Sequence, residues 1–370
     1  MKVLMTADPV GGVWTFALEL CAALARHGVS VTLATLGAPL TSAQRSTAAA
    51  VAGLELVESA FRLEWMAEPW ADLEHAGKWL LQLEREYRPD VIHLNHLVHG
   101  DLPWRAPVVV TGHSCVASWW HAVYGTALPA QWGTYEQRVS RSLQSADCVS
   151  APTRAMLSQL RRYYGPLPIS AVVPNGRDPT LFSPSQRKEH LVLCAGRLWD
   201  VAKNAQALAA VAPHVEWQVC IAGECSSPDG ARAELAAANL HLLGPLAPQE
   251  LAVWFQRAAI YALPARYEPF GLTVLEAALS GCALLLGDIP SLREVWGEAA
   301  WYVAPDDHLR LRQLLSQLIR DSTARTELAA RAADVAARHS PERTAQAYLS
   351  LYSKLTGHPL RSDTPHAARA

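Results

Sequence analysis

Two glutamates eight residues apart, Glu268 and Glu276, enclose a short proline–glycine segment. The stretch reads Tyr267-Glu-Pro-Phe-Gly-Leu-Thr-Val-Leu-Glu276. Glu276 has apolar neighbours on both sides, and a carboxylate in such surroundings needs hydrogen-bond donors, because an unpaired buried charge is very costly. Ligand hydroxyl groups would supply those donors. A pair of carboxylates in this setting therefore indicates a site for a ligand rich in hydroxyls.

Between the two glutamates we expect a loop to enter a helix. Pro264 ends the preceding apolar strand, and the leucines at 272, 275 and 279 recur at the spacing of a buried helical stripe. The first amides of a helix have no partner within it and attract an anion. Here those amides belong to Phe270, Gly271, Leu272 and Thr273. Hydroxyl-binding carboxylates beside an anion-binding helix start are chemistry suited to a nucleotide sugar. The alternative is a glutamate that only complements the helix dipole, with a second on a solvated face.

Two further loops carry groups suited to phosphate. Gly196-Arg197-Leu-Trp-Asp-Val-Ala-Lys203 follows an apolar strand, and arginine and lysine both bind diphosphates. Taken alone, the pair is also compatible with two solvated loop charges. In the N-terminal loop Asp8-Pro-Val-Gly11-Gly12, two glycines allow backbone amides to approach an anion closely. A dinucleotide site is disfavoured, because Gly-x-Gly-x-x-Gly is absent and the next strand ends without an acid.

Histidines and tryptophans supply weaker signals. His113 follows the apolar strand that ends in Val-Thr-Gly, which places it at the carboxyl edge of a sheet, although a packed histidine is the alternative. His93, His96 and His99 have spacing that would suit a metal on one helix face, but their surroundings predict a strand running into a loop, so we predict no metal site. Of the 13 tryptophans, several lie in the first half. Core packing accounts for most such residues.

The elements that must position these groups alternate between strand and helix, which predicts parallel α/β sheets. In the first half we expect a helix near 13–26 and strands near 2–6, 30–35, 91–94, 108–111, 148–151 and 169–173. In the second half we expect strands near 190–196, 217–222, 240–243, 259–263, 283–286 and 301–303. Three prolines and an Asn-Gly turn make residues 173–184 a linker. Two doubly wound domains facing one cleft follow, since such sheets bind ligands beyond the carboxyl ends of their strands.

The composition is that of a two-domain enzyme. The chain has 370 residues, half of them apolar and 18% charged, with a net charge of −2 that offers no general attraction to nucleic acid. Seven cysteines without a Cys-x-x-Cys pair argue against a disulfide framework and a structural zinc site. A start without a signal-peptide core and the absence of a membrane-length apolar run predict a cytoplasmic protein.

The Glu-x7-Glu string around Pro-Phe-Gly-Leu, followed by Glu-Ala-x-x-x-Gly, resembles the donor-site signature of the retaining GT-B glycosyltransferases of family 4. The Gly-Arg-Leu…Lys string and the Gly-Gly loop are similar to further motifs of that family. The resemblance implies two Rossmann-like domains, at 1–170 for the acceptor and 171–340 for the nucleotide sugar. A helix at 341–357 would cross back to the first domain, with a disordered tail at 358–370.

The resemblance also implies roles for the residues. Arg197 and Lys203 would hold the donor diphosphate together with Gly11 and Gly12. Glu268 would bind sugar hydroxyls with help from the helix amides, Glu276 the ribose, and His113 the donor sugar. Trp119 and Trp120 are candidates for an acceptor wall. Asn204 stands where many members have glycine, and Ser114 where they usually have aspartate, which leaves the acceptor side open.

The activity implied is transfer of a sugar from a nucleotide diphosphate to an acceptor hydroxyl, with retention of the anomeric configuration and no cofactor. UDP is the nucleotide that the resemblance favours, with GDP and ADP open. The acceptor is a carbohydrate, a lipid or a small molecule, and peripheral membrane contact stays open. Two alternatives share this architecture: a nucleotide-sugar epimerase, and a catalytically silent sugar-binding relative.

Overall fold

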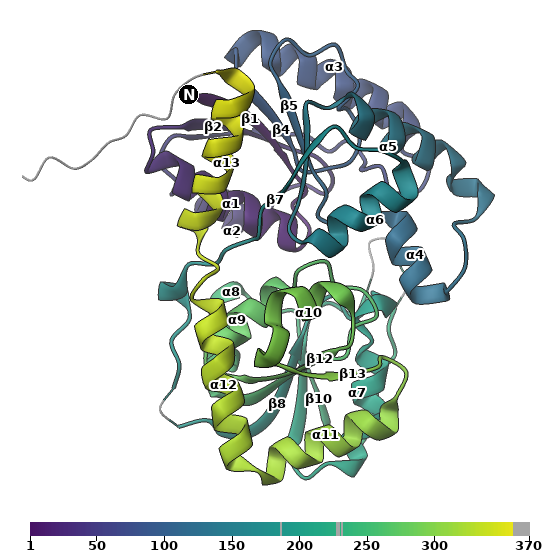
Figure 1. Cartoon of the computed structure of the whole chain (residues 1–370), viewed down its shortest axis with the longest axis vertical. Coiled ribbons are helices and arrows are strands. Elements are labelled where there is room, and N and C mark those ends of the chain that lie inside the picture. The colour runs from purple at the N-terminus through teal and green to yellow at the C-terminus, as the bar shows by residue number, and fades with distance from the viewer. Residues whose placement is uncertain (186, 227–229, 231, 358–370) are drawn as a thin grey trace, which may run out of the picture.

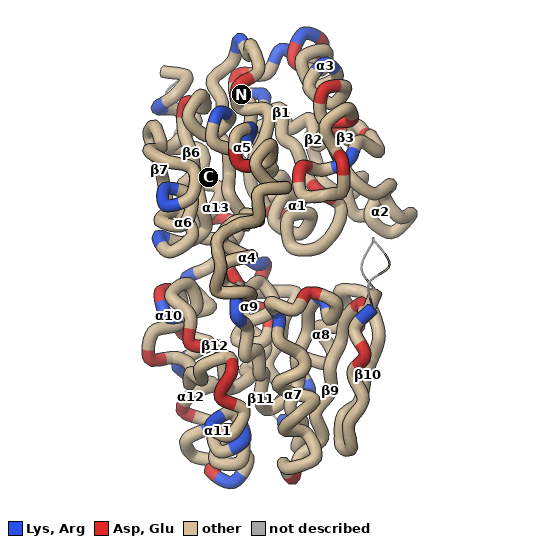
Figure 2. Tube along the Cα trace, turned by 90° about the vertical axis from the view of Figure 1, so that its right-hand side faces the viewer, with Lys and Arg blue, Asp and Glu red and all other residues tan. Residues whose placement is uncertain are grey.

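The chain folds into two parallel α/β domains stacked along the long axis of the molecule (Figure 1). We describe a computed structural model, and the residues described are 1–185, 187–226, 230 and 232–357. The predicted tail at 358–370 lies outside them. Basic residues (Lys, Arg) and acidic residues (Asp, Glu) are interspersed over both domains (Figure 2). Helix α4 (Val116–Tyr124) reaches from the first domain toward the second (Figure 2).

The first domain is built on a seven-stranded parallel sheet in the order β3-β2-β1-β4-β5-β6-β7. Its strands are β1 (Lys2–Ala7), β2 (Ser30–Thr35), β3 (Leu54–Glu58), β4 (Val91–Leu94), β5 (Val108–Thr111), β6 (Cys148–Ala151) and β7 (Ile169–Val172). The helices that accompany it are α1 (Gly12–Ala25), α2 (Ser42–Ala49), α3 (Trp70–Tyr87), α4, α5 (Gly133–Ser145) and α6 (Arg154–Tyr164). Central strands such as β4 and β5 are buried along their whole length, because helices cover both faces of a parallel sheet.

The second domain repeats this plan with a six-stranded parallel sheet in the order β10-β9-β8-β11-β12-β13. Its strands are β8 (Glu189–Ala195), β9 (Gln218–Ala222), β10 (Leu240–Gly244), β11 (Ala258–Leu263), β12 (Ala283–Gly287) and β13 (Trp301–Val303). Its helices are α7 (Ala205–Val211), α8 (Pro248–Arg257), α9 (Leu272–Leu279), α10 (Pro290–Trp296), α11 (His308–Arg320) and α12 (Ser322–Ala336).

The last helix, α13 (Pro341–Thr356), crosses back and packs against α1 of the first domain, as predicted (Figure 1). Tyr348 and Tyr352 are fully buried there, in the same apolar cluster as Phe16. The Tyr352 hydroxyl lies 2.6 Å from Nδ1 of His93 on β4. The C-terminal helix is therefore part of the first domain's core.

The sequence predicted the two-sheet architecture and all of the observed strands except β3. Leu-Glu-Leu-Val-Glu places Leu56 and Val57 side by side, so its alternation breaks after three residues and the segment gives a weak strand signal. β7 runs two residues past the domain boundary predicted at 170. Helix α9 also differs in detail from its predicted stripe. Leu275 is fully buried, but Leu272 and Leu279 are only partly buried, because Val274, Ala277 and Ala278 fill the core instead.

Candidate active site

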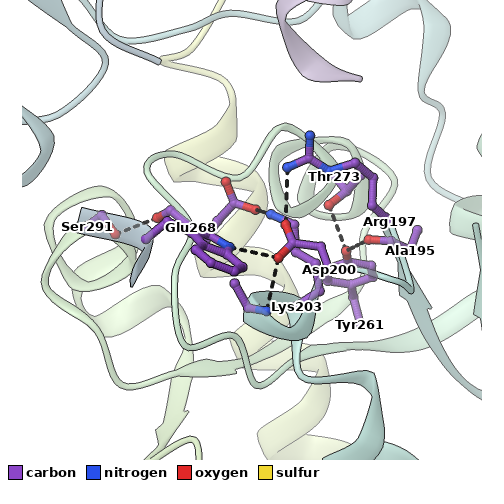
Figure 3. Close-up of polar contacts among 10 residues, drawn as sticks. Ala195, Arg197, Asp200, Lys203, Tyr261, Glu268, Thr273 and Ser291 are labelled. Carbon is purple, nitrogen blue, oxygen red and sulfur yellow. Dashed lines mark hydrogen bonds and ion pairs between the residues drawn. The ribbon is translucent and has the colours of Figure 1, made fainter. Parts of the chain in front are cut away.

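An ion pair lies at the carboxyl edge of the second sheet. Nζ of Lys203, at the end of a 3-10 turn (Val201–Lys203), lies 2.7 Å from Oε2 of Glu268, and both side chains are largely buried (Figure 3). The Ser291 hydroxyl donates to the backbone carbonyl of Glu268 at 2.5 Å. The predicted lysine and the first predicted glutamate are thus neighbours. The ammonium group has two further protons, which leaves it able to bind a second anion.

A second predicted cation, Arg197, is held by Asp200 of the same loop. Its Nη2 donates to Asp200 Oδ2 at 3.2 Å, while the arginine side chain stays 42% exposed (Figure 3). Asp200 is buried and also accepts from the indole N–H of Trp119 at 2.9 Å and from the Ala202 amide at 3.0 Å. The aspartate therefore orients the guanidinium while leaving part of it accessible.

Asn204, where the family resemblance led us to expect glycine, has a left-handed backbone with φ of 57°. Asparagine tolerates this region better than most residues, so it can replace glycine here. Its side-chain amide donates to the carbonyls of Pro264 and Pro305, at 2.8 and 2.7 Å. The substitution therefore adds hydrogen bonds that tie the Lys203 turn to the ends of β11 and β13.

The glycine loop of the first domain lies directly opposite this charged loop. A Cβ added to Gly11 would lie 3.7 Å from Nη1 of Arg197, and one added to Gly12 would lie 3.3 Å from Cδ1 of Leu272. Gly11 has φ of 87°, a conformation that side chains disfavour. The Gly11–Gly12 loop, Arg197 and the start of α9 therefore converge, as the sequence predicted.

The entry to α9 is fixed by its neighbours. Gly271 caps the helix with φ of 89°, and the Thr273 hydroxyl lies 2.8 Å from that of Tyr261, which also donates to the Ala195 carbonyl (Figure 3). Phe270 is buried, with its ring 5.5 Å from that of His339. The unpaired first amides of α9 thus sit on a rigid support.

Glu276 is buried on α9, as predicted, but its partner comes from the linker. Its Oε1 lies 2.8 Å from Nε of Arg177, whose Nη1 lies 2.5 Å from Oε1 of Glu19 on α1. Burial raises the pKa of Glu276 to about 7, against the lowering effect of Arg177. Sequence analysis missed both Arg177 and Glu19, because each carries no motif.

His113 occupies the carboxyl edge of the first sheet, after β5. Its Nε2 lies 2.9 Å from Oδ1 of Asn95, and Asn95 Nδ2 donates to the Thr6 carbonyl at 2.8 Å. That second bond fixes the amide orientation, so Oδ1 faces the ring and the imidazole must donate. Burial lowers the pKa of His113 to about 4. The ring is therefore neutral, with Nδ1 as its acceptor nitrogen.

The three histidines whose spacing resembled a metal site, His93, His96 and His99, use their ring nitrogens in hydrogen bonds within the protein. His93 bonds to Tyr352 and Thr111, while His96 bonds to Thr6 and to His99, which bonds in turn to the Leu73 carbonyl. Burial lowers the pKa of His93 to about 3. Within the described part of the chain, no group of three or more potential ligands is arranged to hold a metal.

The two predicted acceptor tryptophans lie on α4. Trp119 binds Asp200 of the second domain, as above, and Trp120 donates to the Thr126 hydroxyl at 3.1 Å. Both rings are partly exposed and contact Tyr124. Trp119 thus has a structural partner that the sequence did not indicate.

Asp8 is a further group at this edge that sequence analysis left without a role. Its Oδ1 accepts from the Val10 amide at 2.8 Å, and burial raises its pKa to about 7. The charges of Glu64 and Arg197 also act on it. The aspartate belongs to the first domain, and its carboxyl lies close enough to Arg197 of the second domain for the two charges to interact.

Two facing Rossmann-like domains, with a last helix that crosses back to the first, form the GT-B fold. Two family models match the chain: Glycosyltransferase Family 4 over residues 10–181, and Glycosyl transferases group 1 over residues 189–321. The chain belongs to this family, whose members transfer sugars from nucleotide-sugar donors.

Similar proteins match between half and nearly all of the chain. A D-inositol 3-phosphate glycosyltransferase from Xylanimonas cellulosilytica is 27% identical, with 94% of this chain and 92% of the relative covered. A lipopolysaccharide core biosynthesis mannosyltransferase from Rhizobium leguminosarum bv. viciae is 30% identical, with 50% of this chain and 60% of the relative covered.

Solved structures show the same fold. A sucrose-phosphate synthase from Thermosynechococcus elongatus aligns with a TM-score of 0.80 at 18% identity, covering 97% of this chain and all of that one. The Anabaena protein HepE in complex with UDP aligns with a TM-score of 0.74 at 18% identity, covering 96% of this chain and all of that one. Among the described residues, no helix has the length and apolarity to cross a membrane.

Proposed function

We propose that this enzyme transfers a hexose from a UDP-sugar to a hydroxyl group of its acceptor, with retention of configuration. The observation that carries the proposal is the convergence of Arg197, the Gly11–Gly12 loop and the first turn of α9. Cations, free amides and closely approachable backbone on three sides suit a diphosphate. HepE, which has a similar fold, was crystallised in complex with UDP, and this supports UDP as the nucleotide of the donor.

Each predicted residue then has a defined task. Arg197 and Lys203 bind the diphosphate, and Glu268, held by Lys203, accepts hydrogen bonds from sugar hydroxyls. Glu276 accepts from the ribose. His113 is neutral, so its Nδ1 accepts from a hydroxyl of the transferred sugar while Asn95 holds the ring.

The reaction balances without a cofactor. The bond between the sugar's anomeric carbon and the phosphate oxygen breaks, and a bond from that carbon to the acceptor oxygen forms on the same face. The acceptor's proton passes to the departing phosphate oxygen. Arg197, Lys203 and the amides of α9 stabilise the negative charge that develops on that phosphate, which is the largest contribution in sites of this kind.

The first domain would supply the acceptor site, with Asp8 and the α4 tryptophans as its candidate ligands. A D-inositol 3-phosphate glycosyltransferase is among the relatives, so polyols and sugars are the acceptors to test first. A lipid-linked acceptor, reached by peripheral contact with a membrane, is the other class to test.

The test is a UDP-glucose incubation with and without a panel of sugar and polyol acceptors, following UDP release and the anomer formed by NMR. Acceptor-dependent release with an α-linked product is expected. Conversion of the donor to another sugar without any acceptor would indicate an epimerase, and no turnover with any donor would indicate a silent relative. Lys188→Met is the matched control for site variants, because this half-buried lysine donates to the carbonyls of Phe255 and Ser280, at the end of α9 opposite to the proposed phosphate site.

A further inference from the structure

The linker between the domains (residues 173–184) is held in place by backbone contacts where it passes the start of α13. A Cβ added to Gly176 would lie 2.2 Å from the backbone carbon of Ser340, so no other residue fits there. The Arg177 amide donates to the His339 carbonyl at 3.1 Å, and the Thr344 hydroxyl donates to the Pro174 carbonyl at 2.9 Å. The side chain of Arg177 therefore leaves the backbone from a fixed point.

From that point, Arg177 enters the interface between the domains. Its guanidinium lies 2.5 Å from Glu19 of α1 and 2.8 Å from Glu276 of α9, and its carbon centre lies 5.1 Å from the ring centre of Phe182. The arginine side chain is only 8% exposed. One buried cation thus joins an acid of the first domain to the acid predicted to bind the ribose.

The cluster holds two acids for one cation. Arg177 and Glu19 are the charged groups that act on Glu276, and Arg177 and Asp178 act on Glu19. Among the described residues, the charges of α8 and α12, which pack against α9, do not contribute. Burial raises the pKa of both acids, that of Glu276 to about 7. Near neutral pH the cluster therefore exchanges a proton.

Resting on the proposed function, we propose that Arg177 is a positioning residue for the donor. Its guanidinium orients Glu276 toward the ribose diol and ties that carboxylate to Glu19 of the first domain.

The geometry explains how this works. The nearest atoms of the pair are Nε of Arg177 and Oε1 of Glu276, 2.8 Å apart, and the buried cation acts on this carboxylate through its charge. A carboxylate held by a fixed cation keeps one orientation, whereas a buried carboxyl without that cation protonates and turns. Donor binding that requires the ionised form must also release the proton carried by the cluster.

The experiment compares UDP with 2′-deoxy-UDP by calorimetry. Hydrogen bonds to charged groups contribute enough for the wild-type protein to prefer UDP by roughly 10- to 100-fold. In Arg177→Met the preference for UDP should fall below about threefold. The variant should lose less affinity for 2′-deoxy-UDP than for UDP, because 2′-deoxy-UDP lacks one of the hydroxyls that Glu276 is proposed to bind. Arg325→Met is the matched control. This partly buried arginine binds the Leu318 and Ile319 carbonyls, and its loss should lower stability while leaving the preference intact.

A second variant keeps the test decisive if Arg177→Met fails to fold. Glu19→Gln removes the like charge that raises the pKa of Glu276, so UDP should bind more tightly than to the wild type at pH 6 and equally at pH 8.5. An unchanged UDP preference in Arg177→Met, or identical pH profiles for Glu19→Gln and wild type, would overturn the inference alone. Failure of the wild-type protein to bind UDP would overturn the proposed donor as well.

Discussion

The carboxyl edges of the two sheets place different chemistry on the two sides of the site. On the second domain, the polar groups are charges in pairs, such as Lys203 with Glu268 and Arg197 with Asp200. On the first domain, His113 and Asn95 form a neutral, directional hydrogen bond, and Asp8, whose pKa burial raises to about 7, lies at the same edge. Paired charges can be shared with an incoming phosphate, whereas neutral pairs fix the direction of a single bond. We therefore expect donor binding to respond to charge and pH, and the first-domain contacts to respond to geometry.

The largest effect should follow removal of a cation on the charged side. Lys203→Met deletes a donor to the developing phosphate charge and leaves Glu268 without its partner. By analogy with lost transition-state donors, the rate of sugar transfer should fall by about 100- to 1,000-fold. Lys188→Met, measured in the same assay, should stay near the wild-type rate. Comparable losses in both lysine variants would mean that Lys203 acts only through stability.

The pH dependence should come from the charged side as well. Glu276 must be ionised to accept from the ribose, and its pKa is raised to about 7, so donor affinity should fall up to tenfold per unit below that pH. His113, with a pKa lowered to about 4, stays neutral throughout this range. Glu276→Gln should remove the contribution of this carboxyl to the pH profile of kcat/KM for the donor between pH 6 and 8, leaving that of Asp8, whose pKa is also raised to about 7, whereas His113→Gln should keep the whole profile. The reverse pattern would show that the titrating group belongs to the first domain.

On the neutral side, breaking one hydrogen bond should cost less. Asn95→Leu leaves the His113 N–H without an acceptor, an effect of roughly 1–3 kcal/mol, or about a 5- to 150-fold loss in kcat/KM. UDP affinity should stay within about twofold, because the nucleotide is held elsewhere. This is checked by calorimetry beside steady-state kinetics. A large loss of UDP affinity would show that the two sides are not separable.

The smallest expected effect lies where the sides meet. Trp119→Phe keeps an aromatic ring and removes only the hydrogen bond to Asp200, which is worth about 1 kcal/mol, or roughly fivefold. If Trp119 mainly orients Asp200 and hence Arg197, the loss should appear in the KM for the donor. If it mainly stacks on the acceptor, as the sequence suggested, Trp119→Phe should be almost silent and Trp119→Ala should raise the KM for the acceptor.

The sequence predicted most of the fold, because parallel strands and amphipathic helices have local periodic signals. The candidate site residues that it proposed lie on continuous motifs, from Arg197 to Lys203 and from Glu268 to Glu276, and the structure brings these two segments together. The sequence did not predict the groups that pair across the two domains. Arg177 and Glu19 are 158 residues apart, and nothing in the local pattern around either one indicates the other.

Missed roles on the first domain have a similar cause. Asn95 lies after β4 and His113 after β5, and their bond depends on the pairing of two strands rather than on any motif. Trp119 was interpreted from its residue type alone, and its bond to the second domain depends on how the domains dock. Only the folded chain brings these partners together.

Calorimetric titration with UDP-, GDP- and ADP-sugars, wild type beside Glu276→Ala, decides whether this protein binds a nucleotide sugar at α9. We expect that the UDP-sugar binds and that Glu276→Ala weakens this binding by at least about tenfold. Equal binding by wild type and variant, or no binding by any of the three donors, would contradict the donor site described here.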